Sequence, residues 1–179
     1  LMMMSVLQNA FANTSSAFMT AKVTGSIVDL LLAPLGSVEI FIAHALAGIT
    51  RGIIVFLASF LLLFILGITN LPINYIWTVI FLIFGGFALS CIGIIAGIWA
   101  QKFDQLAIVS NFVVQPLAFL SGTFYSIERL PEFLKPIAYS NPFFYIIDGF
   151  RYGFLGVSDI SPYISLIILL GFNFILGYC

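Results

Sequence analysis

The sequence predicts an all-α membrane protein, a polytopic bundle of transmembrane helices. Hydrophobic residues make up 62% of the 179 residues, and charged residues make up only 7%. Soluble domains carry about a quarter of their residues as Asp, Glu, Lys or Arg, so this chain has too few charges to cover a surface in water. Its apolar runs also approach or exceed the roughly 20 residues that a bilayer crossing needs. We therefore expect several helices packed in a membrane.

The same composition suggests no catalytic residue, no metal site, no cofactor and no nucleic-acid partner. Six basic and seven acidic residues are spread along the chain and form no charged patch. Cys91 and Cys179 lie in apolar runs and give no disulfide framework or ligand cluster. The single histidine, His44, is expected to be a buried or interfacial imidazole.

Residues 1–18 have the pattern of the second half of a membrane helix, with amides and hydroxyls among apolar residues. Asn9 and Asn13 lie four residues apart and therefore share one helical face. Because amides are costly against lipid, we expect both to face a water-filled path or, alternatively, to pack between helices. We expect a fragment that lacks the start of this helix and ends inside the last one, at 161–179.

Residues 22–39 are less membrane-like and include three charged residues. The apolar positions at helical spacing are Ile27, Leu30, Leu31 and Leu35. This pattern predicts a short amphipathic helix at the interface, which ends at Pro34 and Gly36. Connections between helices are often only a few residues long, so the insert indicates a docking surface.

The two apolar runs that follow, 40–68 and 75–100, are long enough to cross the bilayer. Arg51 lies in the first run, and we expect it to extend to the interface, with an intramembrane ion pair as the alternative. In the second run, Gly93 and Gly97 form a pair of small residues four apart. Such a pair would let another helix approach closely.

Residues 104–125 form a further predicted crossing, antiparallel to the previous one because only a short polar turn separates them. Pro116 lacks a backbone donor and should kink this helix. Asn111 and Gln115 precede the kink. We therefore expect this helix to line a pathway, with polar packing between helices as the alternative.

Residues 126–159 carry most of the remaining charges and several prolines. Asn141 is suited to a helix N-cap and Pro142 to the first helical turn. The helix that follows would be about 22 Å long, which is less than the roughly 30 Å hydrocarbon core. It is therefore predicted to be re-entrant or interfacial, with Asp148 and Arg151 paired on one face.

The order of these parts, together with several short strings, resembles the membrane subunit of a type-2 ATP-binding-cassette (ABC) exporter, in particular the bacterial inner-membrane transport permeases. The resemblance covers nearly the whole chain. The strings are residues 3–6 (MMSV), 11–13 (FAN), 31–34 (LLAP), 121–126 (SGTFYS), 130–131 (LP), 141–145 (NPFFY) and 149–156 (GFRYGFLG).

The resemblance implies six transmembrane helices, of which this chain has five, and places both termini of the family's subunits in the cytoplasm. It thereby gives the chain an orientation, which its basic residues do not, because they divide evenly between the two sides. Residues 22–39 would hold the cytoplasmic coupling helix, and 126–159 the extracytoplasmic re-entrant segment. The implied contacts with a separate ATPase subunit are Asp29, Leu31, Leu32 and Pro34. The implied re-entrant motif consists of Asn141, Pro142, Tyr145 and Arg151.

The implied function is that of a multi-pass permease subunit in a bacterial inner membrane, surrounded by lipid and paired with a second permease subunit, expected to be identical. The expected path residues are Asn9, Asn13, Asn111 and Gln115. The sequence contains no phosphate-binding loop, so ATP would be bound by the partner subunit. Drug-like amphiphiles, lipid-linked glycans and polysaccharides are all possible substrates. The alternatives are a secondary transporter and a non-transporting membrane scaffold.

Overall fold

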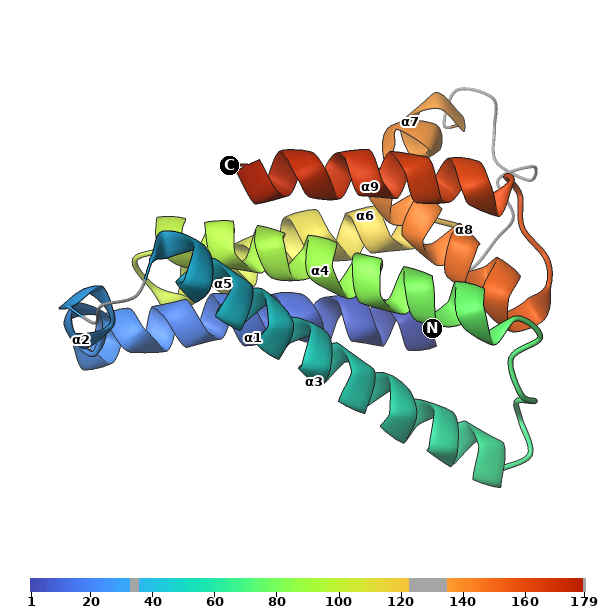
Figure 1. Ribbon diagram of the computed structural model, residues 1–179, viewed down its shortest axis with the longest axis horizontal. Coiled ribbons are helices and arrows are strands. Elements are labelled where there is room, and N and C mark those ends of the chain that lie inside the picture. Colours follow the sequence, from blue (N-terminus) through green and yellow to red (C-terminus); the bar gives the residue numbers. More distant parts are fainter. Residues whose placement is uncertain (33–35, 123–134, 179) are drawn as a thin grey trace.

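The computed structural model describes residues 1–32, 36–122 and 135–178, and its regular elements there are all helical, as predicted. They are α1 (Met2–Thr24), α2 (Ile27–Leu32), α3 (Ser37–Ile65), α4 (Tyr75–Trp99), α5 (Phe103–Val109), a π-helical turn (Ser110–Val114), α6 (Gln115–Phe119), α7 (Lys135–Ser140), α8 (Pro142–Leu155) and α9 (Pro162–Tyr178). Helices α1, α4 and α9 run roughly along the long axis of the molecule, whereas α3 crosses them obliquely and its later half points away from the bundle (Figure 1). We call the end at which α1 ends the Lys22 end, and the end at which α4 begins the Asn74 end.

Helix α4 is the centre of the bundle, because α1, α3, α8 and α9 all pack against it. Among the described residues, two helices have the length and hydropathy of membrane spans, namely α3 with 29 residues and α4 with 25. Helix α9 is apolar as well but shorter. The buried core follows α4 along its length and includes Phe81, Leu82 and Leu89.

The most extensive contact between described helices is that of α1 with α4, and it includes Gly93 and Gly97, the pair noted in the sequence. A Cβ atom on Gly93 would lie 2.7 Å from the carbonyl oxygen of Phe11, and one on Gly97 would lie 3.1 Å from that of Ser15. Both separations are too short for a larger side chain unless the helices move apart. The prediction that these glycines admit another helix is therefore confirmed.

Lys22 joins the same two helices at their ends. Its Nζ atom donates hydrogen bonds to the carbonyl oxygens of Gly97 and Ala100, each at 2.8 Å, and also to that of Ile98. The last carbonyls of a helix lack partners within the helix and attract a positive charge, so the ammonium group provides the hydrogen bonds that the end of α4 lacks. Helix α1 ends directly afterwards at Gly25, which has φ of 77°.

Several helices have bounds that differ from those expected. Helix α1 continues to Thr24 rather than stopping near residue 18, and α3 runs from Ser37 to Ile65 rather than over 40–68. Helix α4 covers the run expected at 75–100. Of the segment expected at 104–125, the described helical part ends at Phe119, and residues 123–125 lie outside the described residues.

The disturbance expected at Pro116 lies one turn earlier in the chain. The backbone N–H of Gln115 donates to the oxygen of Ser110, five residues before it, so the helix widens into a π-helical turn over Ser110–Val114. The helix continues through this turn, because Val114 and Gln115 keep helical φ and ψ, and Pro116, which has no backbone N–H, comes directly after it. Turns of this kind are frequent at functional sites.

Replacing Gly93 with Ala should destabilise the protein, because the added methyl group would meet Thr14 and the Phe11 carbonyl. We expect a loss of about 1–3 kcal/mol in unfolding free energy, typical of overpacking. The control is Gly171→Ala in α9, where no atom lies within 4 Å of the added Cβ. Thermal unfolding in detergent measures the difference, and equal stability of both variants would contradict the described contact.

Candidate functional site

One side of α1 carries a line of polar side chains that the bundle leaves uncovered. The α1 polar stripe consists of Ser5, Asn9, Asn13, Ser16 and Thr20, all exposed or half-buried. Their spacing of three or four residues places them on one face, while the opposite face is buried against α4 and α3. Asn9 and Asn13 therefore lie on one helical face, as their spacing predicts, and both are half-buried.

Within the stripe, most polar groups bond only to their own helix. Asn9 Nδ2 donates to the carbonyl oxygen of Ser5 at 3.0 Å, and Ser16 donates to that of Asn13 at 3.2 Å. Asn13 is the exception, because its Oδ1 atom accepts from Nη1 of Arg51 on α3 at 3.1 Å. Among the described residues, the stripe therefore makes one hydrogen bond to a neighbouring helix, at Asn13, and otherwise bonds within α1.

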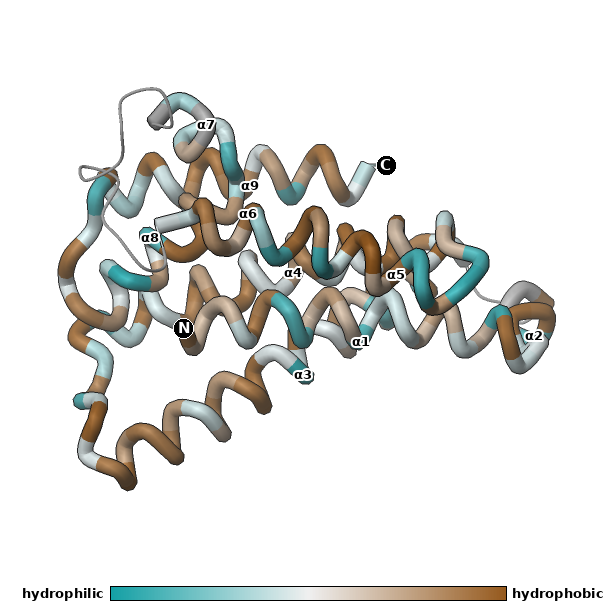
Figure 2. The backbone as a smooth tube through the Cα atoms, turned by 180° about the vertical axis from the view of Figure 1, so that it is seen from behind, coloured by the Kyte–Doolittle hydropathy of each residue, from teal (hydrophilic) through white to brown (hydrophobic). Residues whose placement is uncertain are grey.

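The helices on either side of α1 add further polar groups. Figure 2 shows α1 between α3 and the α5–α6 segment, with hydrophilic positions in all three. Asn111, in the π-helical turn beside α1, is exposed, and Gln115 is half-buried. In the described chain no hydrogen bond joins these two amides to Asn9 or Asn13. The helices expected to line a path thus lie side by side, with their amides unlinked.

Arg51 does not lie where the sequence suggested. Its partner Asn13 precedes Lys22 by nine residues, which is about 14 Å along the helix at 1.5 Å per residue. Lys22 itself is level with the last carbonyls of α4. Arg51 is therefore too deep to extend to the Lys22 end. The alternative, an intramembrane ion pair, is also not seen for Arg51 in the described residues.

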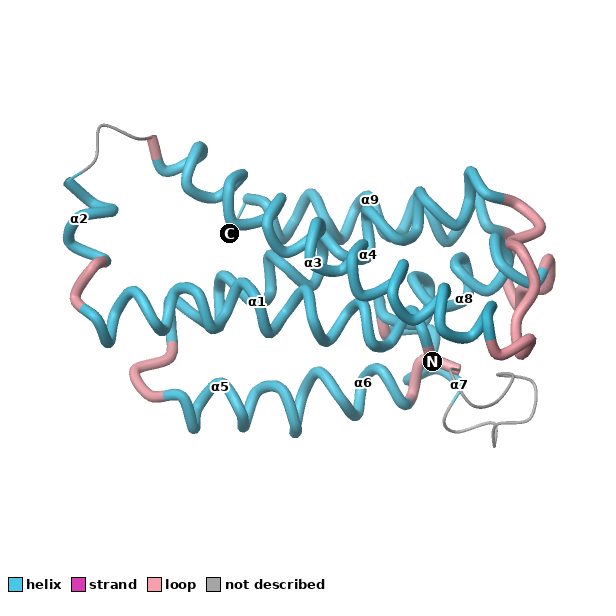
Figure 3. The backbone as a smooth tube through the Cα atoms, turned by 90° about the horizontal axis from the view of Figure 1, so that it is seen from below, coloured by secondary structure: helices cyan, strands magenta, loops and turns pink. Residues whose placement is uncertain are grey.

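The segment expected to dock a partner projects from the Lys22 end. Helix α2 lies beyond the ends of its neighbours and connects α1 to α3 (Figure 3). Asp29 is exposed, and Leu32 is 77% exposed. Leu31 lies in the same short helix, whereas Pro34 lies outside the described residues. An uncovered leucine on a projecting helix is available to a second protein.

At the Asn74 end, α8 begins with the cap that the sequence predicts. The side chain of Asn141 accepts from the N–H of Phe143 at 3.0 Å, and Pro142 occupies the first turn. The amide of Asn141 also donates to the carbonyl oxygen of Leu117 in α6 at 2.6 Å. Tyr145 donates to a carbonyl of α7 at 2.8 Å. The cap therefore also holds α6, α7 and α8 together.

Helix α8 has 14 residues, about 21 Å, so it cannot span the hydrocarbon core, as expected. It is buried along most of its length against α4 and α9. Close packing again relies on glycine, since Gly149 faces Phe81 and Gly153 faces Thr78. The expected charged part of the re-entrant segment, 126–134, lies outside the described residues.

A buried ionic cluster closes the turn between α8 and α9. Arg151 binds Asp148 at 2.7 Å, as predicted, and also Asp159 at 2.9 Å. Asp148, only 2% exposed, accepts from the backbone N–H groups of Asp159 and Ile160 as well. Burial raises the pKa of Asp148, and the two N–H groups and Arg151 oppose that rise. Sequence reasoning missed Asp159, because a contact across a turn has no helical spacing.

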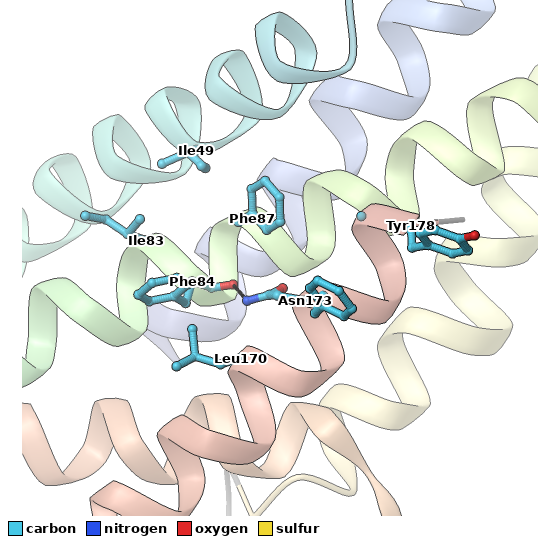
Figure 4. Close-up of a pocket in the computed structure, with 9 residues that line it drawn as sticks. Ile49, Ile83, Phe84, Phe87, Leu170, Asn173 and Tyr178 are labelled. Carbon is cyan, nitrogen blue, oxygen red and sulfur yellow. Dashed lines mark hydrogen bonds between the residues drawn. The ribbon is translucent and has the colours of Figure 1, made fainter. Parts of the chain in front are cut away.

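An apolar groove between α3, α4 and α9 has a volume of about 510 Å³. Figure 4 shows Asn173 in this groove, donating to the carbonyl oxygen of Phe84 at 3.1 Å. The Oδ1 atom of Asn173 is buried and has no hydrogen-bond partner in the described part of the chain. Sequence reasoning also missed Asn173, although a single amide in the apolar run 161–179 was a usable signal.

The described chain thus joins a bundle of apolar helices, an uncovered polar stripe and a projecting short helix. It matches the ABC-2 type transporter family over residues 1–155. The chain belongs to this family. It is therefore an all-α polytopic membrane protein of this family.

Two relatives support the same assignment. The inner membrane transport permease YadH of Escherichia coli K12 is 37% identical over 161 residues, which are 89% of this chain and 62% of that protein. YadH of Shigella flexneri matches with the same identity and coverage. The chain therefore spans less than two thirds of the length of these relatives.

Replacing Asp148 with Asn should loosen the turn between α8 and α9, because Arg151 would lose its better-buried partner. Arg151 would keep Asp159 as a partner, so the cost should be smaller than the about 3–5 kcal/mol typical of a buried charge that loses its only partner. We expect lower thermal stability and faster hydrogen exchange at residues 156–161. The control is Asp104→Asn, which removes an exposed carboxylate. If both variants have the unfolding temperature and the hydrogen-exchange rates of the wild type, the cluster does not stabilise this turn.

Proposed function

We propose that this chain forms half of the translocation path of an ATP-driven exporter in a bacterial inner membrane. It would act as a permease subunit, pair with a second copy of itself and take energy from a separate cassette ATPase. The observation that carries the proposal is the uncovered α1 polar stripe. Membership of the ABC-2 type transporter family also supports a role in transport.

The argument for a path starts from the cost of polar groups in lipid. The α1 polar stripe runs along most of a helix whose other side is buried in an apolar core. A polar side chain against hydrocarbon costs free energy unless it meets water or another polar group. The bonds that Asn9 and Ser16 donate to carbonyls of α1 use only part of the hydrogen-bonding capacity of these side chains. A border with water or a second subunit would satisfy the rest. A path between two copies provides both.

The argument for a partner ATPase starts from α2. The sequence has no phosphate-binding loop of its own, so energy from ATP has to enter through a contact. Helix α2 projects with Leu32 uncovered and follows α1 directly. Because Lys22 fixes the end of α1 to the end of α4, a push on α2 would move both helices together. Rigid-body motion of packed helices is a common way to switch between two states.

The proposal covers export of a drug-like amphiphile, a lipid-linked glycan or a polysaccharide. A secondary transporter would instead need ionisable residues that bind a coupling ion at mid-membrane. In the sequence, Arg51 is the single Asp, Glu, Lys or Arg between residues 40 and 101, and a cation does not bind another cation. A scaffold protein would have no need of water along the stripe, which the next experiment tests.

In a protein whose Cys91 and Cys179 are replaced by Ala, Cys introduced at Asn13 or Asn111 should react with a charged, membrane-impermeant thiol reagent. Water in the path permits formation of the thiolate, which is the reactive form. The control is Ile167→Cys on α9, 68% exposed and apolar in its surroundings. We expect it to react at least about tenfold more slowly because lipid excludes the reagent. Protection of both Asn positions in every nucleotide state removes them from the path.

Replacing Leu32 with Asp should abolish stimulation of the partner's ATPase activity, because a carboxylate would occupy the apolar contact. Membrane insertion should remain normal, since Leu32 is not part of the bundle core. Leu32→Met keeps an apolar side chain of similar volume and should retain most of the stimulation. ATP hydrolysis by the reconstituted complex measures the effect. Normal stimulation in Leu32→Asp would exclude α2 as the coupling contact.

A further inference from the structure

Arg51 is isolated from other charges in both sequence and structure. From residue 40 to residue 101 the sequence contains no other Asp, Glu, Lys or Arg. In the described chain its guanidinium makes one hydrogen bond, from Nη1 to Asn13 at 3.1 Å, and forms no ion pair. A guanidinium has five N–H donors. At least four of them are therefore free to bind something else.

The position of Arg51 makes this isolation costly. Its contact with Asn13 lies about 14 Å along α1 from Lys22, close to half of a hydrocarbon core of roughly 30 Å. The side chain is exposed on the surface of the chain, beside the α1 polar stripe. A charged residue at such a depth is rare and usually faces a cavity or a partner charge.

No carboxylate of the described chain is placed to neutralise Arg51. Asp29, Glu39 and Asp104 lie at the Lys22 end, in or beside the first turns of helices. Asp148 and Asp159 both bind Arg151, and Asp148 also accepts from two backbone N–H groups. A second copy of the same chain would bring another Arg51 to the path instead of an acid. Among the described residues Arg51 therefore has no counter-charge, and a bound anion would supply one.

We infer that Arg51, positioned by Asn13, binds the anionic head group of the transported molecule. A phosphate or carboxylate matches the planar donors of a guanidinium, which can form two parallel hydrogen bonds to one oxyanion. The exposed apolar side chains of Ile54 and Leu57, next along α3, suit an attached hydrocarbon tail. The substrate class is thus an anionic amphiphile. This inference rests on the proposed transport function and narrows its substrate.

The test measures binding to the full-length permease in a neutral detergent, without ATPase or transport. The probes are dodecyl phosphate and dodecanoate, with dodecylphosphocholine as a zwitterion of the same chain length. We expect Arg51→Gln to weaken binding of the two anions at least about tenfold, as loss of a charged hydrogen bond does. Arg51→Lys keeps the charge and should lose less. Binding of dodecylphosphocholine should not change.

The matched control is Lys102→Gln, which removes an exposed positive charge at the Lys22 end. It should bind both anions within twofold of wild type. Anion binding by Arg51→Gln equal to wild type overturns the site, and so does an equal loss in Lys102→Gln. Unfolding temperatures without probe show that the variants are folded, and Arg51→Lys supplies the comparison if Arg51→Gln is not.

The result is separable from the proposed transport function. If Arg51→Gln binds anions normally while Cys at Asn13 still reacts with the charged reagent, the path stands and the anion site fails. If anion binding depends on Arg51 but the reagent reaches neither Asn13 nor Asn111, the site stands and the path fails. A selective loss for dodecyl phosphate over dodecanoate would assign the head group to phosphate.

Discussion

The close contact of α1 with α4 determines how the rest of the chain can be arranged. In lipid, the hydrophobic effect contributes little to the association of helices, so close packing and hydrogen bonds have to stabilise the bundle. Gly93 and Gly97 let the backbone of α1 approach α4 closely, and Lys22 binds the carbonyls at which α4 ends. Since α1 is fixed over its length and at its end, its rotation is fixed too. That rotation directs the α1 polar stripe away from the core.

The same device recurs where α8 meets the other half of α4. Gly149 and Gly153 face Phe81 and Thr78, and the backbone N–H of Asn74 donates to the carbonyl oxygen of Gly153 at 2.8 Å. Helix α8 is too short to span, so its ends require partners within the protein. The Asn141 cap satisfies one end and the cluster of Asp148, Arg151 and Asp159 closes the other. A non-spanning helix can therefore remain buried at the Asn74 end.

Sequence reasoning predicted those features that depend on neighbours within one helix. The Asn141 cap, the pairing of Asp148 with Arg151 and the glycine pair at 93 and 97 all follow from spacings of a few residues. It missed the contacts that depend on how helices are placed, namely the bonds of Lys22 to α4 and of Asp159 to Arg151. The roles of the predicted coupling and path residues remain predictions, because they concern partners outside the chain.

Lys22 and Arg51 show that the position of a basic residue along a helix determines which hydrogen-bond partners it can reach. The sequence does not give these partners directly. Both are basic, and both reach across to a neighbouring helix. Lys22 lies at a helix end, where unpaired carbonyls surround it and complete its hydrogen bonding. Arg51 lies mid-helix, where neighbouring backbone carbonyls are already paired within their helices, and it obtains a single side-chain amide. The fold completes the hydrogen bonding of Lys22, whereas among the described residues it leaves most donors of Arg51 without a partner, which is why the anion site is proposed at Arg51 and not at Lys22.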